Sequence, residues 1–279
     1  MAMARSTTPT RSARISEMRL PLYQIDAFAT DEPFTGNPAA VCPLEAWLPD
    51  AVMQQIAAEN NLSETAFFVP EGEGYRLRWF TPTTEVDLCG HATLASAFVV
   101  FGWLRPERSE VTFATQQAGP LIVTRDGEFL ALDFPARPAA PCPMPRGLDR
   151  ALGRPPTTVL AARDYLAVYE TADDIRALTP DFAAIAALDR FAVIVTAPGT
   201  DGIDFVSRFF APARGVDEDP VTGSAHCTLI PYWAERLGKS RLQARQLSRR
   251  GGALSCAMRG DRVTIAGRTL LYLEGIITI

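Results

Sequence analysis

Apolar and polar residues alternate with a period of two in several short stretches of the first half of the chain. In an extended strand, this period places successive side chains on opposite faces. The pattern predicts strands over residues 20–28, 66–69, 75–80, 110–115, 120–124 and 129–134. Two longer apolar-rich segments, residues 46–60 and 91–104, have the length and composition of helices.

The second half of the chain continues this mixture of many strands and few helices. Strands are expected over residues 157–162, 165–170, 191–195, 204–210, 242–248, 253–258 and 262–267, and helices over 172–179, 181–188 and 224–238. Strands and helices do not alternate regularly, as they would in a parallel sheet built from strand–helix–strand units. The order of elements therefore predicts an α+β fold.

A proline-rich segment divides the chain in two. Proline cannot donate to a sheet ladder and does not fit inside a helix. We therefore expect residues 135–145 to link an N-terminal half, residues 18–134, to a C-terminal half, residues 146–269. A last strand near residues 270–279 is free to return to the first half.

The first residues, 1–17, are polar and rich in serine, threonine and arginine. They lack the apolar core of a secretory signal. We expect a disordered extension, or sequence ahead of an alternative start at Met18. A transit peptide is the other reading.

The composition indicates a globular protein. Of its residues, 47% are hydrophobic and 21% are charged, as in globular proteins. The length of 279 residues is enough for two domains, each with a core of its own. The net charge of −5 gives no attraction for nucleic acid, and no apolar run has the length of a membrane span. Five cysteines, an odd number, do not form a disulfide framework. We expect a reduced, cytoplasmic protein.

The sequence offers little for a metal or a nucleotide. It has two histidines, His91 and His226, and no CxxC or HExxH pattern. It also lacks the GxGxxG and GxxxxGK[ST] loops that hold dinucleotides and phosphates. We expect no metal and no cofactor.

One unit occurs twice along the chain. RWFTP from Arg78 matches RFFAP from Arg208, an offset of 208 − 78 = 130. At this offset Val86-Asp87 matches Val216-Asp217. Three extra residues then precede Gly223, so that CGHA around Gly90 matches TGSA around Gly223. Each copy then enters a predicted helix, and we interpret the match as a duplication.

The duplicated unit has a specific physical use. A glycine lets a ligand approach the backbone, and the helix that follows begins with N–H groups that have no partner inside the helix. These donors and the helix dipole attract an anion. Two such helix starts facing each other would hold a carboxylate and stabilise an adjacent enolate. The alternative is two ordinary helix entries, the second with Ser224 as its cap.

Four motifs in order resemble the PhzF, or phenazine-biosynthesis-like, family. They are FTGNPAAVC (34–42), NLSETAF (61–67), EVDLCGHAT (85–93) and EDPVTGSAHC (218–227). The resemblance implies two pseudo-symmetric α+β halves, each a β-sheet wrapped around a central helix as in diaminopimelate epimerase. It also implies an active site in the cleft between the halves, a homodimer, and no cofactor or metal.

The same resemblance implies the site residues. Glu64 of the NLSET motif would be the acid/base, and His91, Asp219 and Ser224 would complete the site. Glu64 leads into an apolar run, so its carboxylate is either exposed at the end of that strand or held in a cleft. In a cleft, desolvation would raise its pKa into a useful range. His91 opens a helix, whose positive end disfavours imidazolium, so we expect a neutral histidine there.

Other candidate contacts to a substrate follow from the motifs. Gly90 and Gly223 would offer backbone N–H groups, and Ser63 lies next to the acid/base in the sequence. Asn37 would either line the cleft or only fix the turn with Pro38.

The cysteines bear on which chemistry is possible. Two-base epimerases of this fold use one thiol from each half, just before the loop glycine. Here Cys89 precedes Gly90, but Thr222 precedes Gly223. A threonine hydroxyl is too weakly acidic to replace a thiolate, so racemisation by two thiols is disfavoured.

The interpretation that best fits these observations is a cofactor-independent isomerase. Glu64, assisted by His91 and Asp219, would move a proton between carbons of a small carboxylate-bearing metabolite. One alternative is an epimerase that uses Cys89 with a carboxylate. The other is a non-catalytic protein that keeps the fold to bind a small acid or another protein.

Overall fold

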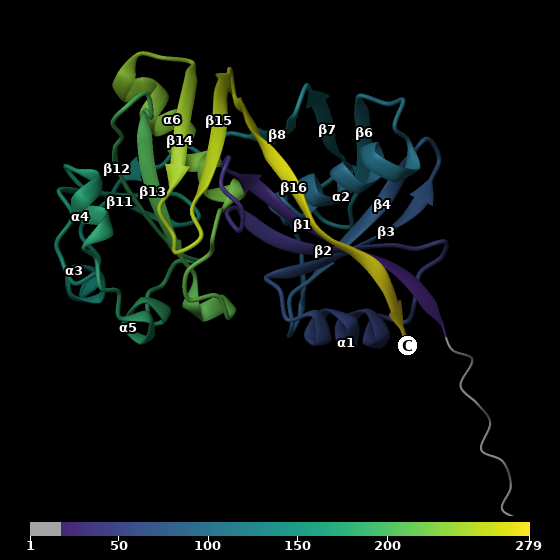
Figure 1. Ribbon diagram of the computed structural model, residues 1–279. Coiled ribbons are helices and arrows are strands. Elements are labelled where there is room, and N and C mark those ends of the chain that lie inside the picture. Colours follow the sequence, from purple (N-terminus) through teal and green to yellow (C-terminus); the bar gives the residue numbers. More distant parts are fainter. Residues whose placement is uncertain (1–17) are drawn as a thin grey trace, which may run out of the picture.

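The computed structural model describes residues 18–279, and the expectation for residues 1–17 lies outside the described part. The described chain forms a 16-stranded mixed sheet that curves into two halves (Figure 1). The strands of the first half are β1 (Arg19–Ala29), β2 (Asn37–Pro43), β3 (Glu64–Glu71), β4 (Gly74–Phe80), β5 (Glu85–Val86), β6 (Glu110–Ala114), β7 (Leu121–Asp126) and β8 (Phe129–Pro135). Those of the second half are β9 (Ala140–Pro141), β10 (Thr158–Ala161), β11 (Tyr165–Val168), β12 (Val193–Pro198), β13 (Phe205–Phe210), β14 (Arg241–Gln246), β15 (Gly252–Arg259) and β16 (Arg262–Thr278).

The helices are few, as the sequence predicts for an α+β fold. They are α1 (Asp50–Asn60), α2 (Gly90–Val99) with a π-helical turn η1 (Val100–Leu104), α3 (Leu148–Ala151), α4 (Ala172–Arg176), α5 (Phe182–Ala186), a 3-10 turn η2 (Pro212–Arg214), and α6 (Gly223–Leu237).

The first half is a closed ring of strands around α2. The order β1-β2-β3-β4-β6-β7-β8-β16 returns to its beginning because β16 also pairs with β1. Nine of the ten residues of α2 are buried. Their small side chains, such as Ala92 and Ala95, let the surrounding strands approach the helix closely.

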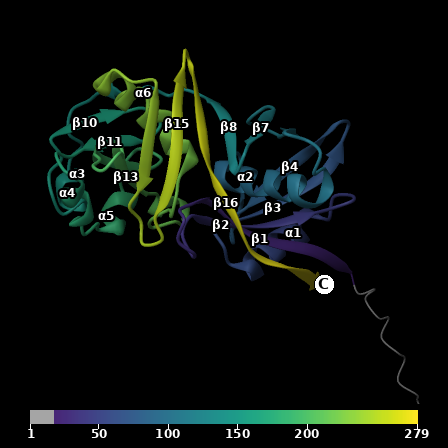
Figure 2. The same ribbon diagram turned by 45° about the horizontal axis from the view of Figure 1, so that its top comes forward.

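The second half curves around α6 in the same way. Its strands follow the order β16-β15-β14-β13-β12-β11-β10-β9, and α6 packs on β14, β15 and β16. Trp233 of α6 is 1% exposed and stacks on Phe205 of β13. The short helices α3, α4 and α5 bury Leu148, Ile175 and Ile185 in a separate cluster, and lie at the edge of this half (Figures 1 and 2). The expected fold class of two halves, each wrapped around a central helix, is confirmed.

Strand β16 connects the two halves. Its first residues pair with β15 and β8, and its last residues pair with β1, where Leu20 lies opposite Ile277. The chain therefore ends beside the start of β1 (Figure 1). The proline-rich residues 135–145 include the two-residue strand β9, which pairs with β10.

The structure differs from the predicted elements in several places, and β5, β9 and α3 have no counterpart among the predicted elements. β2 was not predicted as a strand, because its sequence NPAAVCP has two prolines and few β-branched residues; it is nonetheless buried on both faces. The helix expected over 46–60 begins only at Asp50, directly after Pro49. The helix expected over 91–104 changes to a π-helical turn after Val99.

Candidate active site

A cavity of about 650 Å³ lies between the halves. The first half contributes Glu64, Cys89 and His91 to its lining, together with the turn after β4. The second half contributes residues from β13 to the start of α6, and residues near β10 and β12. The cleft between the halves is thus a hollow with side chains from both copies of the duplicated unit.

The two helix starts meet at this cavity. A Cβ atom built on Gly90 would lie 3.8 Å from the Cα atom of Gly223, and both glycines line the cavity. Neither N-cap residue, Cys89 or Thr222, caps its helix with a side-chain hydrogen bond. Neither N-cap side chain therefore takes up the N–H groups of the first two residues of its helix, and such groups attract an anion. Ser224, the alternative cap, lies inside α6 and does not cap it.

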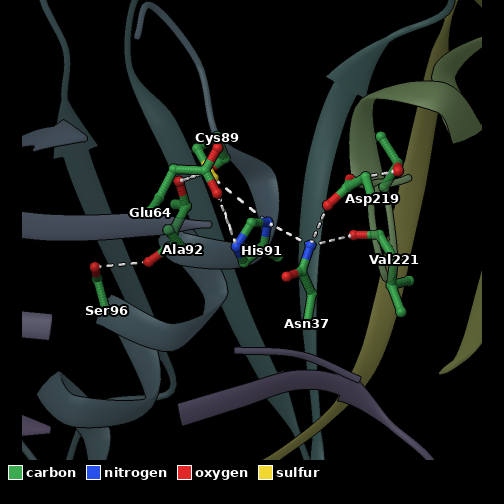
Figure 3. A network of polar contacts seen from close by, with 10 residues as sticks. Asn37, Glu64, Cys89, His91, Ala92, Ser96, Asp219 and Val221 are labelled. Atoms are coloured by element: carbon green, nitrogen blue, oxygen red, sulfur yellow. Dashed lines mark hydrogen bonds and ion pairs between the residues drawn. The ribbon is translucent and has the colours of Figure 1, made fainter. Parts of the chain in front are cut away.

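Glu64 and His91 form an ion pair at the cavity wall (Figure 3). Glu64 is the first residue of β3, held beside Ala39 of β2. His91 is the second residue of α2 and is 5% exposed. Glu64 Oε2 lies 3.2 Å from His91 Nε2. The carboxylate is thus fixed, yet remains at the surface of the cavity.

The surroundings of His91 favour a protonated ring, whereas the sequence predicts a neutral imidazole. Burial by itself would lower the pKa of His91, but the neighbouring Cys89 and Glu64 raise this pKa well above its ordinary value. Within its own helix, His91 meets only the positive end of the α2 dipole, which favours the neutral ring. Glu64, a carboxylate that the fold brings from β3, favours imidazolium.

Asn37 connects the two halves behind His91. Its Nδ2 atom lies 3.2 Å from His91 Nδ1, and donates to Asp219 Oδ1 at 2.7 Å and to the Val221 carbonyl at 2.9 Å (Figure 3). Asn37 is fully buried. It is not among the residues that line the cavity, and neither is Ser63. The expectation that Asn37 and Ser63 touch the substrate stays a prediction, and Asn37 joins the two halves through its bonds to Asp219 and Val221.

Asp219 is held from the second half. Thr222 Oγ1 donates to Asp219 Oδ2 at 2.5 Å. Gln246 Nε2 donates to the Asp219 carbonyl at 2.8 Å, while Gln246 Oε1 accepts from the Thr222 N–H. Burial, together with the nearby Glu64, raises the pKa of Asp219 to about 6, although His91 and the hydrogen bonds oppose the rise. A carboxyl with this pKa can gain or lose a proton near neutral pH.

Cys89 lies on the opposite side of His91 from Asp219. Its Sγ atom is 3.4 Å from His91 Nδ1, and burial raises the pKa of the thiol to about 11. Within residues 18–279, the Glu64, Cys89 and His91 ligand atoms form a cluster in which all lie within 4.8 Å of one another. Oxygen, nitrogen and sulfur donors at this spacing suit zinc, although a metal would have to displace the thiol proton.

The structure corrects the register of the duplicated unit. Arg78 makes a two-pronged pair with Glu85 at 2.7 Å for both contacts. Arg208 makes the same pair with Glu218, at 2.7 and 2.9 Å. Glu218 is thus the counterpart of Glu85, and EVDLCGHA aligns without a gap with EDPVTGSA. The three extra residues lie before Glu218, so the match of Val86-Asp87 with Val216-Asp217 is wrong.

Four residues of the site were not found from the sequence. Arg163, Phe191 and Arg214 line the cavity, and Gln246 holds the loop of Asp219. The sequence did offer a pointer to Arg214, because this residue lies in the segment where the second copy of the duplicated unit is three residues longer than the first. The other three lie outside the motifs, where only the tertiary structure brings them to the cleft.

The fold and the cleft define the class of two-half proteins built like diaminopimelate epimerase. One solved structure of a hydroxyproline epimerase from Agrobacterium vitis is 11% identical, covers 94% of this chain and 93% of its own, and has a TM-score of 0.57, which shows likeness of fold alone. The family model described as phenazine biosynthesis-like protein, PhzC–PhzF, matches residues 25–275. The chain belongs to this family.

Two relatives illustrate how similar its members are. An uncharacterized isomerase from Pseudomonas aeruginosa is 55% identical over 258 residues, which is 92% of this chain and 98% of that one. The crystal structure of a PhzF-family protein from Enterococcus faecalis is 49% identical, covers 94% of this chain and 100% of its own, and has a TM-score of 0.90.

Among residues 18–279, no helix combines the length and the apolar character needed to cross a membrane.

Proposed function

We propose that this protein is an isomerase in which Glu64 moves a proton between two carbons of a small carboxylate-bearing substrate. The observation that carries the proposal is the Glu64–His91 pair, which lies in the same cavity as two opposed helix starts. The names of relatives support the reaction class, since the one from Pseudomonas aeruginosa is called an isomerase.

The anion site explains how a weak base could remove a proton from carbon. The substrate carboxylate would lie at the N–H groups beside Gly90 and Gly223, both of which line the cavity. Negative charge that develops on the substrate as the proton leaves would be stabilised by these fixed donors and by the two helix dipoles. Glu64 would accept the proton from one carbon and return it to another, so that the reaction is balanced within the substrate. Such a transfer needs only a base and an anion site, and the proposal includes no cofactor.

His91 and Asp219 would assist the transfer. His91 holds the Glu64 carboxylate through Nε2. Asp219, with a pKa raised to about 6, would be a second proton carrier on the opposite side of His91. The roles assigned to His91, Asp219 and Ser224 remain part of the proposal.

Deuterium incorporation tests the proposal directly. The protein would be incubated in D₂O with a panel of small carboxylic acids, and deuterium at carbon followed by NMR. We expect exchange into one acid, reduced by at least about a thousandfold in Glu64→Gln, the upper part of the range for loss of a general base. Asp87→Asn is the matched control, because Asp87 is an exposed carboxylate that lines the same cavity. Undiminished exchange in Glu64→Gln would overturn the proposal.

A second function is favoured by the position of Cys89. Its thiol lies 3.4 Å from His91 Nδ1, so the two could act as a proton-transfer pair in an epimerase, with a carboxylate on the other side of the substrate. The pKa of about 11 argues against an easily formed thiolate, which is why we place this reading second.

A further inference from the structure

The cavity has a second cationic region, which the proposed function does not use. The Phe191 ring contacts two guanidinium groups, with Arg163 Cζ 4.2 Å and Arg214 Cζ 4.7 Å from the ring centroid. All three residues line the cavity that contains Glu64 and His91. Stacking on an aromatic ring leaves the N–H edges of a guanidinium group to hydrogen bonds. In Arg163 the Nε–Nη2 edge donates to Asp164, so its Nη1 group is the one left for a ligand.

The Arg163 guanidinium is held in place by two neighbours. Its Nε atom lies 3.2 Å from Asp164 Oδ1, and the Asp164 side chain is only 2% exposed. Its Nη2 atom donates to Ser224 Oγ at 3.3 Å. Because Ser224 is the second residue of α6, Arg163 lies next to one of the two helix starts. A cation fixed in this way loses little side-chain freedom when it binds an anion.

Arg214 lines the cavity from a part of the second copy of the duplicated unit that has no counterpart in the first copy. It ends the 3-10 turn η2, in the segment that makes the second copy three residues longer than the first. Within residues 18–279 it forms no ion pair, whereas its neighbours Arg208 and Arg163 each pair with a carboxylate. Arg214 is exposed where it lines the cavity, and a cation without a protein partner is available to a ligand.

From this arrangement we infer that Arg163, Phe191 and Arg214 form a second anion subsite, and that the substrate carries two acidic groups. One carboxylate would lie at the starts of α2 and α6, within reach of Glu64. The second group, a carboxylate or a phosphate, would lie against the Arg214 guanidinium and the Nη1 group of Arg163. The inference rests on the proposed function for the first carboxylate, and it adds a substrate class and two specificity-determining residues.

Calorimetry with matched acids tests the subsite. The probes are straight-chain dicarboxylates and phosphonocarboxylates, each compared with the monocarboxylate of the same carbon number. At least one doubly acidic probe is expected to bind about tenfold more tightly than its partner, as for one added charge-assisted contact. A preference for the carboxylate or the phosphonate series identifies the second group. If no doubly acidic probe exceeds its partner, the inference is wrong.

Two variants and one control locate the effect. In Arg214→Gln we expect the advantage of the doubly acidic probe to fall about tenfold while monocarboxylate binding is unchanged. Arg163→Lys keeps the charge beside Asp164 but loses the planar fork, and is expected to show the same selective loss. Arg236→Gln is the control, since Arg236 is an exposed arginine over Trp233 that does not line the cavity. An advantage that survives in both cavity variants would overturn the inference.

The measurement is separable from the test of the proposed function. The same titrations in Glu64→Gln follow binding where the proposed base is absent. If dicarboxylates show no advantage but deuterium exchange still depends on Glu64, only the subsite inference fails. If the advantage depends on Arg214 but exchange does not depend on Glu64, only the isomerase proposal fails.

Discussion

Gly90 and Gly223, which are 133 positions apart in the sequence, face each other at the starts of α2 and α6. A Cβ atom on either glycine would lie 3.8 Å from the Cα atom of the other. This is ordinary van der Waals contact, so the fold does not itself require glycine at both positions. Each added Cβ atom would also lie beside a core ring, Phe134 for Gly90 and Phe28 for Gly223, while both glycines line the cavity.

The double substitution of Gly90→Ala with Gly223→Ala therefore tests whether the close approach of the two helix starts is needed for binding. Alanine is the better helix former and either Cβ alone makes only ordinary contacts, so each single variant should change the free energy of unfolding by less than about 1 kcal/mol. In the double variant the two methyl groups would face each other and move the helix starts apart, so binding of small carboxylates should weaken about tenfold or more. Chemical denaturation and calorimetry measure the two effects, with Gly102→Ala, a helical glycine with open space around it, as control. Unchanged carboxylate binding would count against the helix-start clamp.

Substitution of Cys89 distinguishes the two candidate reactions. In Cys89→Ala the isomerase proposal expects deuterium exchange within about tenfold of wild type, since the Glu64–His91 pair remains. Cys227→Ala controls for the loss of a buried thiol outside the cavity. Exchange that disappears in Cys89→Ala but persists in Glu64→Gln would instead establish the epimerase reading.

The hydroxyl of Thr222 is expected to tune Asp219. Its hydrogen bond to Oδ2 favours the ionised carboxylate and so opposes the effect of burial. Without it, in Thr222→Val, the pKa of Asp219 should rise above its value of about 6, and the carboxyl should stay protonated to higher pH. A carbon-13 NMR titration of the carboxyl group reports this pKa, with Thr222→Ser as the variant that keeps the bond. A pKa that falls or does not move would show that the bond has no such effect.

His226 should make the fold sensitive to acid. Its Nδ1 atom pairs with the Thr222 carbonyl at 2.8 Å, while its buried Nε2 atom has no partner among the described residues. Burial lowers the pKa of His226 from 6.5 to about 4. Between these values the unfolded chain binds the proton and the folded chain does not, so stability is lost as the pH falls from 6.5 towards 4.

The expected loss is on the order of 3 kcal/mol over this window, at about 1.4 kcal/mol per pH unit. Urea unfolding of wild type and of His226→Thr at several pH values measures the part of this loss that comes from His226. Threonine is the natural replacement, because Thr93, at the equivalent position of α2, makes the same bond to the carbonyl four residues earlier. Asp219 titrates in both proteins, so its opposite contribution cancels in the difference. If the two proteins lose stability in parallel, His226 is not the source.

Much of the fold could be predicted because its signals are local. The alternation of apolar residues identified strands such as β4 and β8, and the motif around Gly223 identified the start of α6. β2 was missed because its strand character comes from burial between β1 and β3 and not from its own residues. The duplicated unit was found, but its register was set wrongly, since only the pairing of Arg208 with Glu218 shows where the second copy is longer.

The sequence by itself determined which chemical groups this protein has: a glutamate before an apolar strand, a histidine and a thiol at one helix start, and an aspartate before the other. The tertiary structure decided which of these groups touch. It joined Asn37 to Asp219 across 182 positions, placed Glu64 against His91 so that imidazolium is favoured, and brought Arg163 and Arg214 to one ring. The physical reason is that periodicity and helix starts depend on neighbours along the chain, whereas pKa shifts and binding sites depend on neighbours in space.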